Sequence, residues 1–252
     1  IAKYDFNGNL LWVKTAGGAS FQTGTSLCAD GNGNVYLTGL FGSPTITFDS
    51  IVLTNAGIGS VFIAKYDTNG NVIWAKNTGG TDKDVGYSVS TDVNGNVWVA
   101  GRFESPVITF DSIVLHQPIN SVYPIFIAIY SASGSVLGAT ALPGKVNNGN
   151  EIHISTDNYG NAFIIGDFML DSFYIGADTL PLTGGENIFV AKYSSRPPPP
   201  QGINTSTCFN NTANLSATGI GTLSWYDQSS GGACLGIGEI FITPILTANQ
   251  TF

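Results

Sequence analysis

The segment IAKYDFNGNLLWVK at Ile1–Lys14 occurs again, with few changes, as IAKYDTNGNVIWAK at Ile63–Lys76. A weaker copy, IAIYSASGSVLGAT, lies at Ile127–Thr140, and the first half returns as VAKYSS at Val190–Ser195. The tyrosines of the four copies are 62, 64 and 63 residues apart. Self-similarity at a fixed period is the sequence signature of a repeat architecture. Residues 1–195 therefore consist of one unit that recurs about every 63 residues.

Two further blocks recur between these copies in a constant order. The first joins a D-x-x-G-N turn to an apolar run, and its copies are GTSLCADGNGNVYLTGLF from Gly24, GYSVSTDVNGNVWVAGRF from Gly86 and EIHISTDNYGNAFIIGDF from Glu151. The second reads TITFDSIVLT, VITFDSIVLH and FYIGADTLPLT, starting at Thr45, Val107 and Phe173. The same order of blocks in each period indicates that every repeat has the same structure.

Each block has the alternation of half-buried β-strands. In NVWVAGRF, Val97 and Val99 alternate with Trp98 and Ala100, and such period-2 runs are typical of strands. Asn-Gly or Ser-Gly pairs separate the runs, and both Asn and Gly tolerate the positive φ of tight hairpins. In the best-preserved repeat we expect a short hairpin at TFDSIVL and four main strands, A to D, at Tyr87–Asp92, Asn96–Phe103, Ile125–Tyr130 and Ser135–Thr140.

Four antiparallel strands joined by tight turns form one blade of a β-propeller. Strand A carries small residues, such as Ser26, Cys28 and Ser88, which suit the innermost position where blades crowd the axis. Only two repeats are complete, so we predict an all-β fold of four-stranded antiparallel propeller blades in an incomplete ring. We expect the missing strand and further blades upstream of Ile1. The alternatives are an open arc capped by neighbouring subunits and a linear stack.

The motif D-x-x-G-N-[VA]-[YWF]-[VLI]-x-G, followed by I-F-[IV]-A-K-Y-D-x-x-G-N-x-[LI]-W-A-K, resembles the SBBP-type β-propeller repeat. The resemblance covers about residues 1–195, and three registers of the motif agree. It implies a propeller, in a family common in secreted and surface proteins of Bacteroidota, and it does not imply an enzyme. The repeated Trp12 and Trp74 of strand D could be exposed platforms for sugars, but packing between blades is the favoured interpretation.

A Pro-rich linker at 196–201, with Pro197–Pro200 in extended polyproline II, separates the repeat region 1–195 from a second module at 202–252. The segment from Cys208 onward resembles the small Ig-like modules found near the C-termini of secreted Bacteroidota proteins. We therefore predict a small Ig-like β-sandwich with Trp225 in its core, and we expect this sequence to contain only part of the domain. In an extracellular setting, Cys208 and Cys234 could form a disulfide; the alternative is two unpaired residues.

Composition excludes several classes of function. The chain of 252 residues has 9 basic and 17 acidic side chains, a net charge of −8, so we expect no nucleic-acid partner and no polybasic membrane patch. No apolar run is long enough for a membrane span. The chain has only two His and three Cys, and it has no H-x-x-x-H or C-x-x-C motif. It therefore has few candidate ligands for a transition metal. We expect no cofactor.

The repeated turns offer weak candidates for calcium binding. Asp5, Asp30, Asp67 and Asp92 each begin a D-x-N-G-N segment whose alternating oxygens resemble the start of a calcium loop. No bidentate Glu follows at the twelfth position, so the favoured interpretation is a turn in which Asp bonds local backbone. We therefore expect no metal.

Catalytic carboxylates are also weakly indicated. The acidic residues nearest the expected channel do not repeat and belong to no motif; they are Glu104, Glu151, Asp167 and Asp171. Paired carboxylates would be needed for glycoside hydrolysis. The two histidines, His116 and His153, have no partner in sequence. We expect no catalytic residue and no enzyme.

The third block contains a candidate modification motif. Ser50, Ser112 and Thr179 follow an Asp and precede an aliphatic residue at matching positions. This D-[ST]-[aliphatic] pattern resembles the O-glycosylation acceptor of Bacteroidota periplasmic and secreted proteins. An Asp-Ser turn that repeats because blades repeat is the structural interpretation, and the two are compatible.

We therefore expect a noncatalytic extracellular or cell-surface protein, with the propeller as a scaffold for adhesion or for assembly into a filament. The arrangement resembles surface adhesins or fibre proteins exported by the type IX secretion system. Expected partners are other copies of the protein, or glycans of cell surfaces and the extracellular matrix. The alternatives are a glycan-binding module at the propeller loops and the noncatalytic part of a polysaccharide-active enzyme.

Overall fold

The structure is a computed structural model that describes residues 1–119, 121, 123–142, 152–169, 172–175, 178–181, 183–185, 187–194, 201–203, 207, 210–218, 223–226 and 233–246. Every regular element in these residues is a β-strand, and among them no helix suited to crossing a bilayer occurs. The chain separates into two compact units, Ile1–Ser194 and Ser195–Phe252. Each unit is described by itself below.

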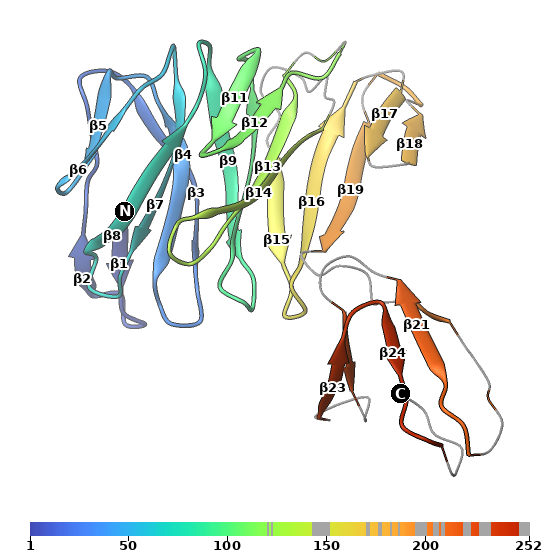
Figure 1. The fold of residues 1–252 in the computed structure, drawn as a ribbon. Helices are drawn as coiled ribbons and strands as arrows, with labels where there is room; N and C mark the ends of the chain where they lie inside the picture. Colours follow the sequence, from blue (N-terminus) through green and yellow to red (C-terminus); the bar gives the residue numbers. More distant parts are fainter. Residues whose placement is uncertain are drawn as a thin grey trace. The chain divides into compact units, whose positions relative to one another are not determined.

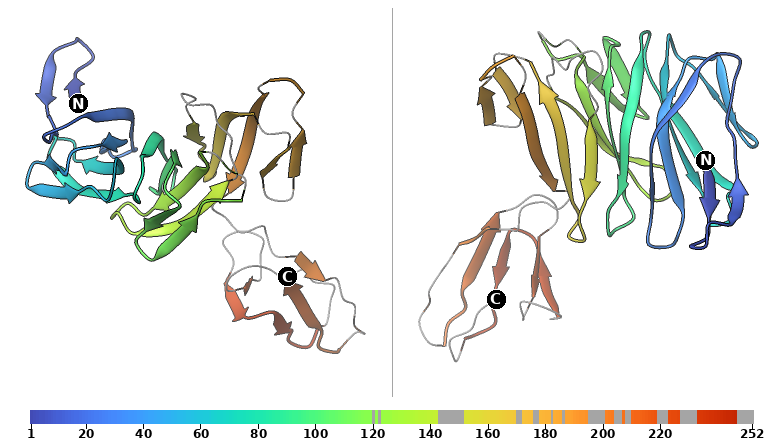
Figure 2. Two further views of the ribbon diagram at one scale, coloured as in Figure 1. Left: turned by 90° about the horizontal axis from the view of Figure 1, so that it is seen from above. Right: turned by 180° about the vertical axis from the view of Figure 1, so that it is seen from behind.

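The first unit consists of propeller blades that follow one another in chain order (Figures 1 and 2). Blade 1 contains, from one edge to the other, β3 (Gln22–Ala29), β4 (Val35–Phe41), β7 (Ser60–Tyr66) and β8 (Val72–Thr78). Blade 2 contains β9 (Asp84–Thr91), β10 (Val97–Phe103), β13 (Ile125–Tyr130) and β14 (Val136–Leu142). All neighbouring strands in these sheets are antiparallel. The predicted four-stranded blade, with strands A to D in chain order, is therefore confirmed.

Two partial sheets flank the complete blades. Blade 3 contains β15 (His153–Thr156), β16 (Asn161–Phe168) and β19 (Asn187–Ser194), and no fourth strand is present among the described residues. Strands β1 (Ala2–Tyr4) and β2 (Leu10–Val13) form a two-stranded sheet with the sequence of strands C and D. The described residues of this unit thus form two complete blades and two partial ones, as the count of repeated blocks predicts.

A short hairpin leaves each blade between strands B and C. The three hairpins are β5–β6 (Thr45–Phe48 and Ile51–Thr54), β11–β12 (Val107–Phe110 and Ile113–His116) and β17–β18 (Ser172–Ile175 and Asp178–Pro181). Phe48 and Phe110 point their rings onto strand C, with centroids 5.3 and 5.2 Å from those of Phe62 and Phe126. Each hairpin thus packs on its own blade through an aromatic pair.

The turns between strands A and B are three-residue hairpin loops in which only the glycine has a positive φ. In blade 2 the amide of Gly95 donates to Asp92 O, and the amide of Asp92 donates to Asn96 O. Gly95 has φ +77°, whereas Asn94 is not among the residues with positive φ. This is a type I turn followed by a left-handed residue, which only glycine adopts at low cost. The expected strand A ends one residue early, at Thr91, because Asp92 belongs to the turn.

Consecutive blades are joined along their innermost strands by a repeated side-chain contact. The hydroxyl of Ser26 accepts a hydrogen bond from the amide of Val89 (3.2 Å), and the hydroxyl of Ser88 accepts one from Ile154 (3.1 Å). The small residues of strand A thus bring the backbone of the next blade within hydrogen-bond distance. His153 stands at the same repeat position in blade 3, where it is exposed.

The outer strands are joined by a second repeated contact. The indole N–H of Trp12 donates to Thr68 O (3.1 Å), and that of Trp74 donates to Ala132 O (3.2 Å). Each tryptophan therefore lies against the C–D turn of the next blade. The expectation that these tryptophans pack between blades is confirmed.

The second unit contains two small antiparallel sheets. One contains β20 (Gln201–Ile203), β21 (Asn214–Thr218) and β24 (Ile240–Ile242), and the other β22 (Ser224–Tyr226) and β23 (Cys234–Ile237). Trp225 of the second sheet stacks on Phe241 of the first, with centroids 5.9 Å apart, and its indole N–H donates to Gly238 O (2.9 Å). This contact gives the Ig-like sandwich its aromatic core.

One boundary of the predicted linker is wrong. Gln201 was expected in the linker, but it begins β20 and pairs with Thr218. Proline has no amide hydrogen for a strand ladder, so Gln201 is the first residue after the four prolines that can enter one. The rest of the linker, 196–200, lies outside the described residues.

Candidate functional site

A polar hollow lies where the A–B turns of three consecutive blades meet. It has a volume of about 590 Å³. Its walls come from residues 29–32 and 34 of blade 1, residues 91–95 of blade 2 and residues 156–158 of blade 3, together with Lys65 and Ala132. One end of the innermost strands thus holds a site to which each blade contributes the same turn.

The aspartates of these turns are bound within the turns themselves. One carboxylate oxygen of Asp30 accepts the amides of Asn32 and Asn34, both at 2.9 Å, and the other accepts the Asn34 side chain at 2.8 Å. The same three bonds recur in the turns that begin at Asp5, Asp67, Asp92 and Asp157. These are the bonds that the turn interpretation predicts.

These hydrogen bonds also affect titration. The side-chain hydrogen bond from Asn161 holds the pKa of Asp157 below its usual value, and Asn71 does the same for the pKa of Asp67. Both carboxylates are therefore ionised at neutral pH. In the described parts of the chain, no three His, Cys, Asp or Glu side chains gather as a metal site would require. Calcium binding at Asp5, Asp30, Asp67 or Asp92 stays a weak prediction.

Tyr159 is an exposed aromatic residue adjacent in sequence to the lining of the polar hollow, and the sequence analysis did not single it out. It follows the lining residue Asn158 and stands where the other A–B turns have Asn32 and Asn94. Its amide makes the normal turn bond to Asp157 (2.8 Å), while its side chain is 74% exposed. The hydrogen bonds of the turn therefore do not depend on the aromatic ring of Tyr159. An alignment of the repeats, searched for positions where one copy differs from the others, would have identified Tyr159.

Two of the candidate glycosylation acceptors, Ser50 and Ser112, lie at hairpin tips. Thr179 instead lies on β18, where it pairs with Tyr174 as Val52 pairs with Thr47, so the prediction that it matches Ser50 in position is wrong. Ser50, Ser112 and Thr179 are all exposed. Asp49 and Asp111, just before two of them, have φ of 49° and face Lys14 and Lys76 of strand D at 3.9 and 3.1 Å. The hydroxyls are accessible from solvent, and their modification stays a prediction.

The candidate catalytic carboxylates do not form a described pair. Glu104 binds Arg102 of its own blade at 3.2 Å, whereas Asp167 lies on β16 of blade 3. Glu151 and Asp171 lie outside the described residues. His116 and His153 are exposed on β12 and β15. The structure brings none of these described residues to the polar hollow.

A buried carboxylate that the sequence analysis missed belongs to blade 2. Asp84 is fully buried and accepts four hydrogen bonds, two from Ser105 and one each from Gly80 and Glu104. Burial raises its pKa. Gln22 binds Ser43 at the same repeat position in blade 1. Asp84 thus ties the start of the B–C connection to strand A, which is a structural role.

The predicted disulfide involves a residue outside the described part of the chain, Cys208. Cys234 is exposed, and its thiol lies 3.6 Å from Gly236 O. Cys28 lies on the innermost strand of blade 1, where burial raises the pKa of its thiol to about 12. Cys234 is therefore open to a reagent, whereas Cys28 is half-buried and its raised pKa keeps the thiol protonated.

This difference gives a labelling prediction. At mildly alkaline pH, iodoacetamide should alkylate Cys234 of the folded, reduced protein and leave Cys28 unmodified, because the thiolate is the reactive form. Mass spectrometry of tryptic peptides measures both. Unfolding in denaturant should make Cys28 react. If Cys234 reacts only after reduction, it is paired, and the disulfide prediction gains support; reaction without reductant would contradict it.

Comparison with known proteins supports the two-part architecture. Residues 197–252 match the model of the CHU_C-associated Ig-like domain. The chain is 27% identical to the uncharacterized WD repeat-containing protein L264 of Acanthamoeba polyphaga mimivirus, in an alignment that covers 73% of this chain and 16% of that protein. It is 28% identical to the regulatory protein FlaEY of Caulobacter vibrioides, over 42% of this chain and 11% of that protein.

The chain thus spans less than a fifth of the length of either relative. A WD-repeat relative agrees with the blades of the first unit, and the Ig-like match agrees with the two small sheets of the second. The chain is a repeat-containing β protein made of propeller blades and an Ig-like module.

Proposed function

We propose that the chain is a noncatalytic structural protein of the cell surface or extracellular space, whose propeller blades form a rigid scaffold for attachment. The observation that carries this proposal is that the repeated polar side chains make hydrogen bonds between neighbouring blades. Trp12 and Trp74, like Lys3 and Lys65, donate to the backbone of the next blade's C–D turn. The repeat thus maintains contacts between blades, as a load-transmitting scaffold requires.

The extracellular setting is supported by the second unit and by the composition. The Ig-like module matches a CHU_C-associated domain, and the SBBP-type resemblance of residues 1–195 suggests the same class of secreted Bacteroidota proteins. A charged fraction of only 10% with a net charge of −8 suits a surface protein. Export by the type IX system and glycosylation at Ser50, Ser112 or Thr179 belong to this proposal.

Surface labelling tests the proposal. Antibodies against the purified chain should label intact cells of the producing organism, and a protease added to those cells should remove the label. Deletion of the gene should reduce attachment of the cells without loss of a hydrolytic activity. Detection of the protein only in the cytoplasmic fraction, or loss of a polysaccharide-degrading activity on deletion, would contradict the proposal.

A second candidate function is glycan binding at the polar hollow. Amide and carboxylate groups of three turns line it, and the exposed ring of Tyr159 lies beside it in sequence. Sugars bind through hydroxyls, which pair with such polar groups, and through apolar C–H faces, which stack on aromatic rings. The departure of Tyr159 from the repeated Asn is the observation that favours this function.

A binding screen with matched variants tests this candidate. The chain is applied to an array of surface and matrix glycans, and the affinity for any hit is measured by calorimetry. Tyr159→Ala should weaken binding about tenfold, the loss of one aromatic contact. Tyr174→Ala, which removes an exposed ring on β17, should leave binding unchanged. Equal losses in both variants would exclude the hollow as the site.

A further inference from the structure

Four turns of the first unit contain an Asn-Gly pair at the same place in the turn. Each pair lies in a D-x-N-G-N segment, and the asparagines are Asn7, Asn32, Asn69 and Asn94. All four are exposed. An exposed asparagine followed by glycine is the arrangement in which an asparagine side chain reacts most readily with its own main chain, because glycine has no Cβ to hinder its nitrogen.

The reaction in question is deamidation through a cyclic imide. The glycine nitrogen loses its proton and attacks Cγ of the asparagine, so that a new C–N bond closes the ring and the side-chain nitrogen leaves as ammonia. Water then opens the succinimide at either carbonyl and yields aspartate or isoaspartate. The sum consumes water and releases ammonia, with no change of oxidation state. In isoaspartate the main chain runs through the former side chain and is longer by a methylene.

In the folded turns the attacking nitrogen is held in a hydrogen bond. The amide of Gly33 donates to Asp30 O (3.0 Å), and the amide of Asn32 donates to the Asp30 carboxylate (2.9 Å). The corresponding bonds in the other three turns are 2.8 to 3.1 Å long. Donation to a carbonyl favours the protonated form of the glycine nitrogen. Ring closure therefore requires the turn to open.

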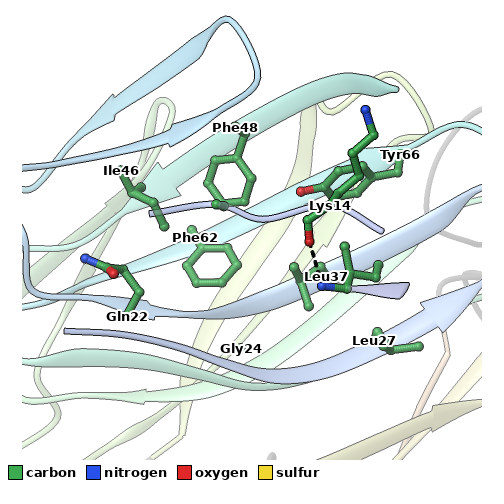
Figure 3. A pocket seen from close by; sticks show the side chains of 11 residues that line it. Lys14, Gln22, Gly24, Leu27, Leu37, Ile46, Phe48, Phe62 and Tyr66 are labelled. Atoms are coloured by element: carbon green, nitrogen blue, oxygen red, sulfur yellow. Dashed lines mark hydrogen bonds between the residues drawn. The ribbon is translucent and has the colours of Figure 1, made fainter. Parts of the chain in front are cut away.

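The strands beside the turns oppose such opening. The turn of Asn69 joins β7 to β8, and the last pair of that ladder before the turn is Tyr66 with Val72. Phe62 and Tyr66 of β7 are at most 3% exposed and line the apolar cavity of blade 1 (Figure 3). Because buried rings hold the strand that leads into the turn, the turn opens only when the end of the blade also opens.

We propose that these four asparagines are sites of spontaneous deamidation, that the folded turns hold them unreactive, and that the isoaspartate formed in an opened chain prevents the blade from closing again. The length of a hairpin loop fixes the register of the strands beside it. A loop lengthened by a methylene cannot make both the glycine and the asparagine bonds to the turn's Asp. The reaction thus separates chains that stayed folded from chains that have opened, and this inference does not depend on the proposed scaffold role.

A comparison of folded and unfolded samples tests the protection. The chain is incubated at one mildly alkaline pH, either in guanidinium chloride or folded in sodium chloride of the same ionic strength, and peptide mapping by mass spectrometry follows each asparagine. Deamidation at the four sites should be slower in the folded chain by at least ~tenfold, because only opened turns react. Asn34 and Asn96 are followed by valine, so they are internal controls and should react much more slowly than the four sites when unfolded.

A variant of one turn shows whether its hydrogen bonds provide the protection. Asp67→Ala removes the acceptor of the Asn69 amide and should speed deamidation of Asn69 in the folded chain roughly three- to tenfold, with Asn94 unchanged. Asp67→Ser is the matched control. In the C–D turn of blade 2, Ser131 stands at this position and its hydroxyl accepts the amide of Ser135 (3.1 Å), so serine should restore the slow reaction.

Refolding tests the consequence of the modification. Chains aged in guanidinium chloride with reductant at mildly alkaline pH are diluted, and circular dichroism measures the fraction that refolds. This fraction should fall as isoaspartate accumulates. Chains aged for the same time at mildly acidic pH, where the glycine nitrogen keeps its proton, should refold. A variant with serine at all four sites should also refold after alkaline ageing, because Ser133 already stands at this position before Gly134.

Three outcomes would overturn the proposal. Equal rates of deamidation in the folded and unfolded chains would show that the turns give no protection. Complete refolding of chains rich in isoaspartate, or an equal loss of refolding in the four-site serine variant, would show that the modification does not keep blades open. None of these outcomes alters the labelling of intact cells, so they leave the proposed surface role untouched.

Discussion

Replacing Asp92 with alanine should lower the free energy of unfolding of the first unit by roughly 3–5 kcal/mol. The carboxylate of Asp92 accepts hydrogen bonds from the amides of Asn94 and Asn96, from the Asn96 side chain and from the indole N–H of Trp98, at 2.8 to 3.1 Å. Trp98 is 1% exposed, so its N–H cannot turn to water when the carboxylate is lost. A buried donor without a partner costs its full desolvation energy.

Asp67→Ala is the matched control for this variant. Asp67 makes the same three turn bonds, at 2.8 Å each, and these bonds are exposed. The indole at this turn, that of Trp12, donates to Thr68 O and not to the Asp67 carboxylate. Water can replace the lost acceptor, so the loss of stability should be much smaller. Denaturation in urea, followed by tryptophan fluorescence, measures both variants. Equal losses would show that the turn, and not the buried indole, accounts for the effect.

Gly101→Ala should lower the free energy of unfolding by about 3 kcal/mol or more. A Cβ at this position would lie 2.1 Å from the carbonyl oxygen of Val85 and 2.5 Å from the ring of Phe126. The first contact is with backbone of the paired strand β9, so relief requires strands A and B of blade 2 to separate. Gly39 stands at the same repeat position and would meet the backbone oxygen of Thr23 in the same way, whereas a Cβ at the equivalent Gly166 would meet the side chains of Ile152 and Phe189.

Gly138→Ala provides the comparison within the same blade. Gly138 lies on the outer strand β14, and a Cβ there meets nothing within 4 Å. Alanine loses less conformational entropy on folding than glycine, so this variant should be neutral or more stable by up to roughly 1 kcal/mol. The melting temperatures of the two variants measure the difference. A Gly138→Ala variant as unstable as Gly101→Ala would contradict the steric argument.

The features that could be predicted from sequence depend on local backbone preferences. The period of the tyrosines, the alternation in NVWVAGRF and the glycine after each Asp-x-Asn determined the number, order and approximate bounds of the strands. These signals are local because side-chain alternation and positive φ act over only a few residues. The same locality explains two wrong bounds, the end of strand A at Asp92 and the end of the linker at Gln201. Asp92 lies where a strand meets a turn, and Gln201 lies where a proline run meets a strand.

The features that only the tertiary structure decided are contacts between residues about one repeat apart. Trp74 donates to Ala132, 58 positions later, and three separate turns meet around one polar hollow. Phe163 and Trp98 occupy the same repeat position, yet one is exposed and the other buried. The repeated sequence determines the strands and turns of each blade. Which side chains are buried depends on how the blades pack against each other, because that packing brings together residues distant in sequence.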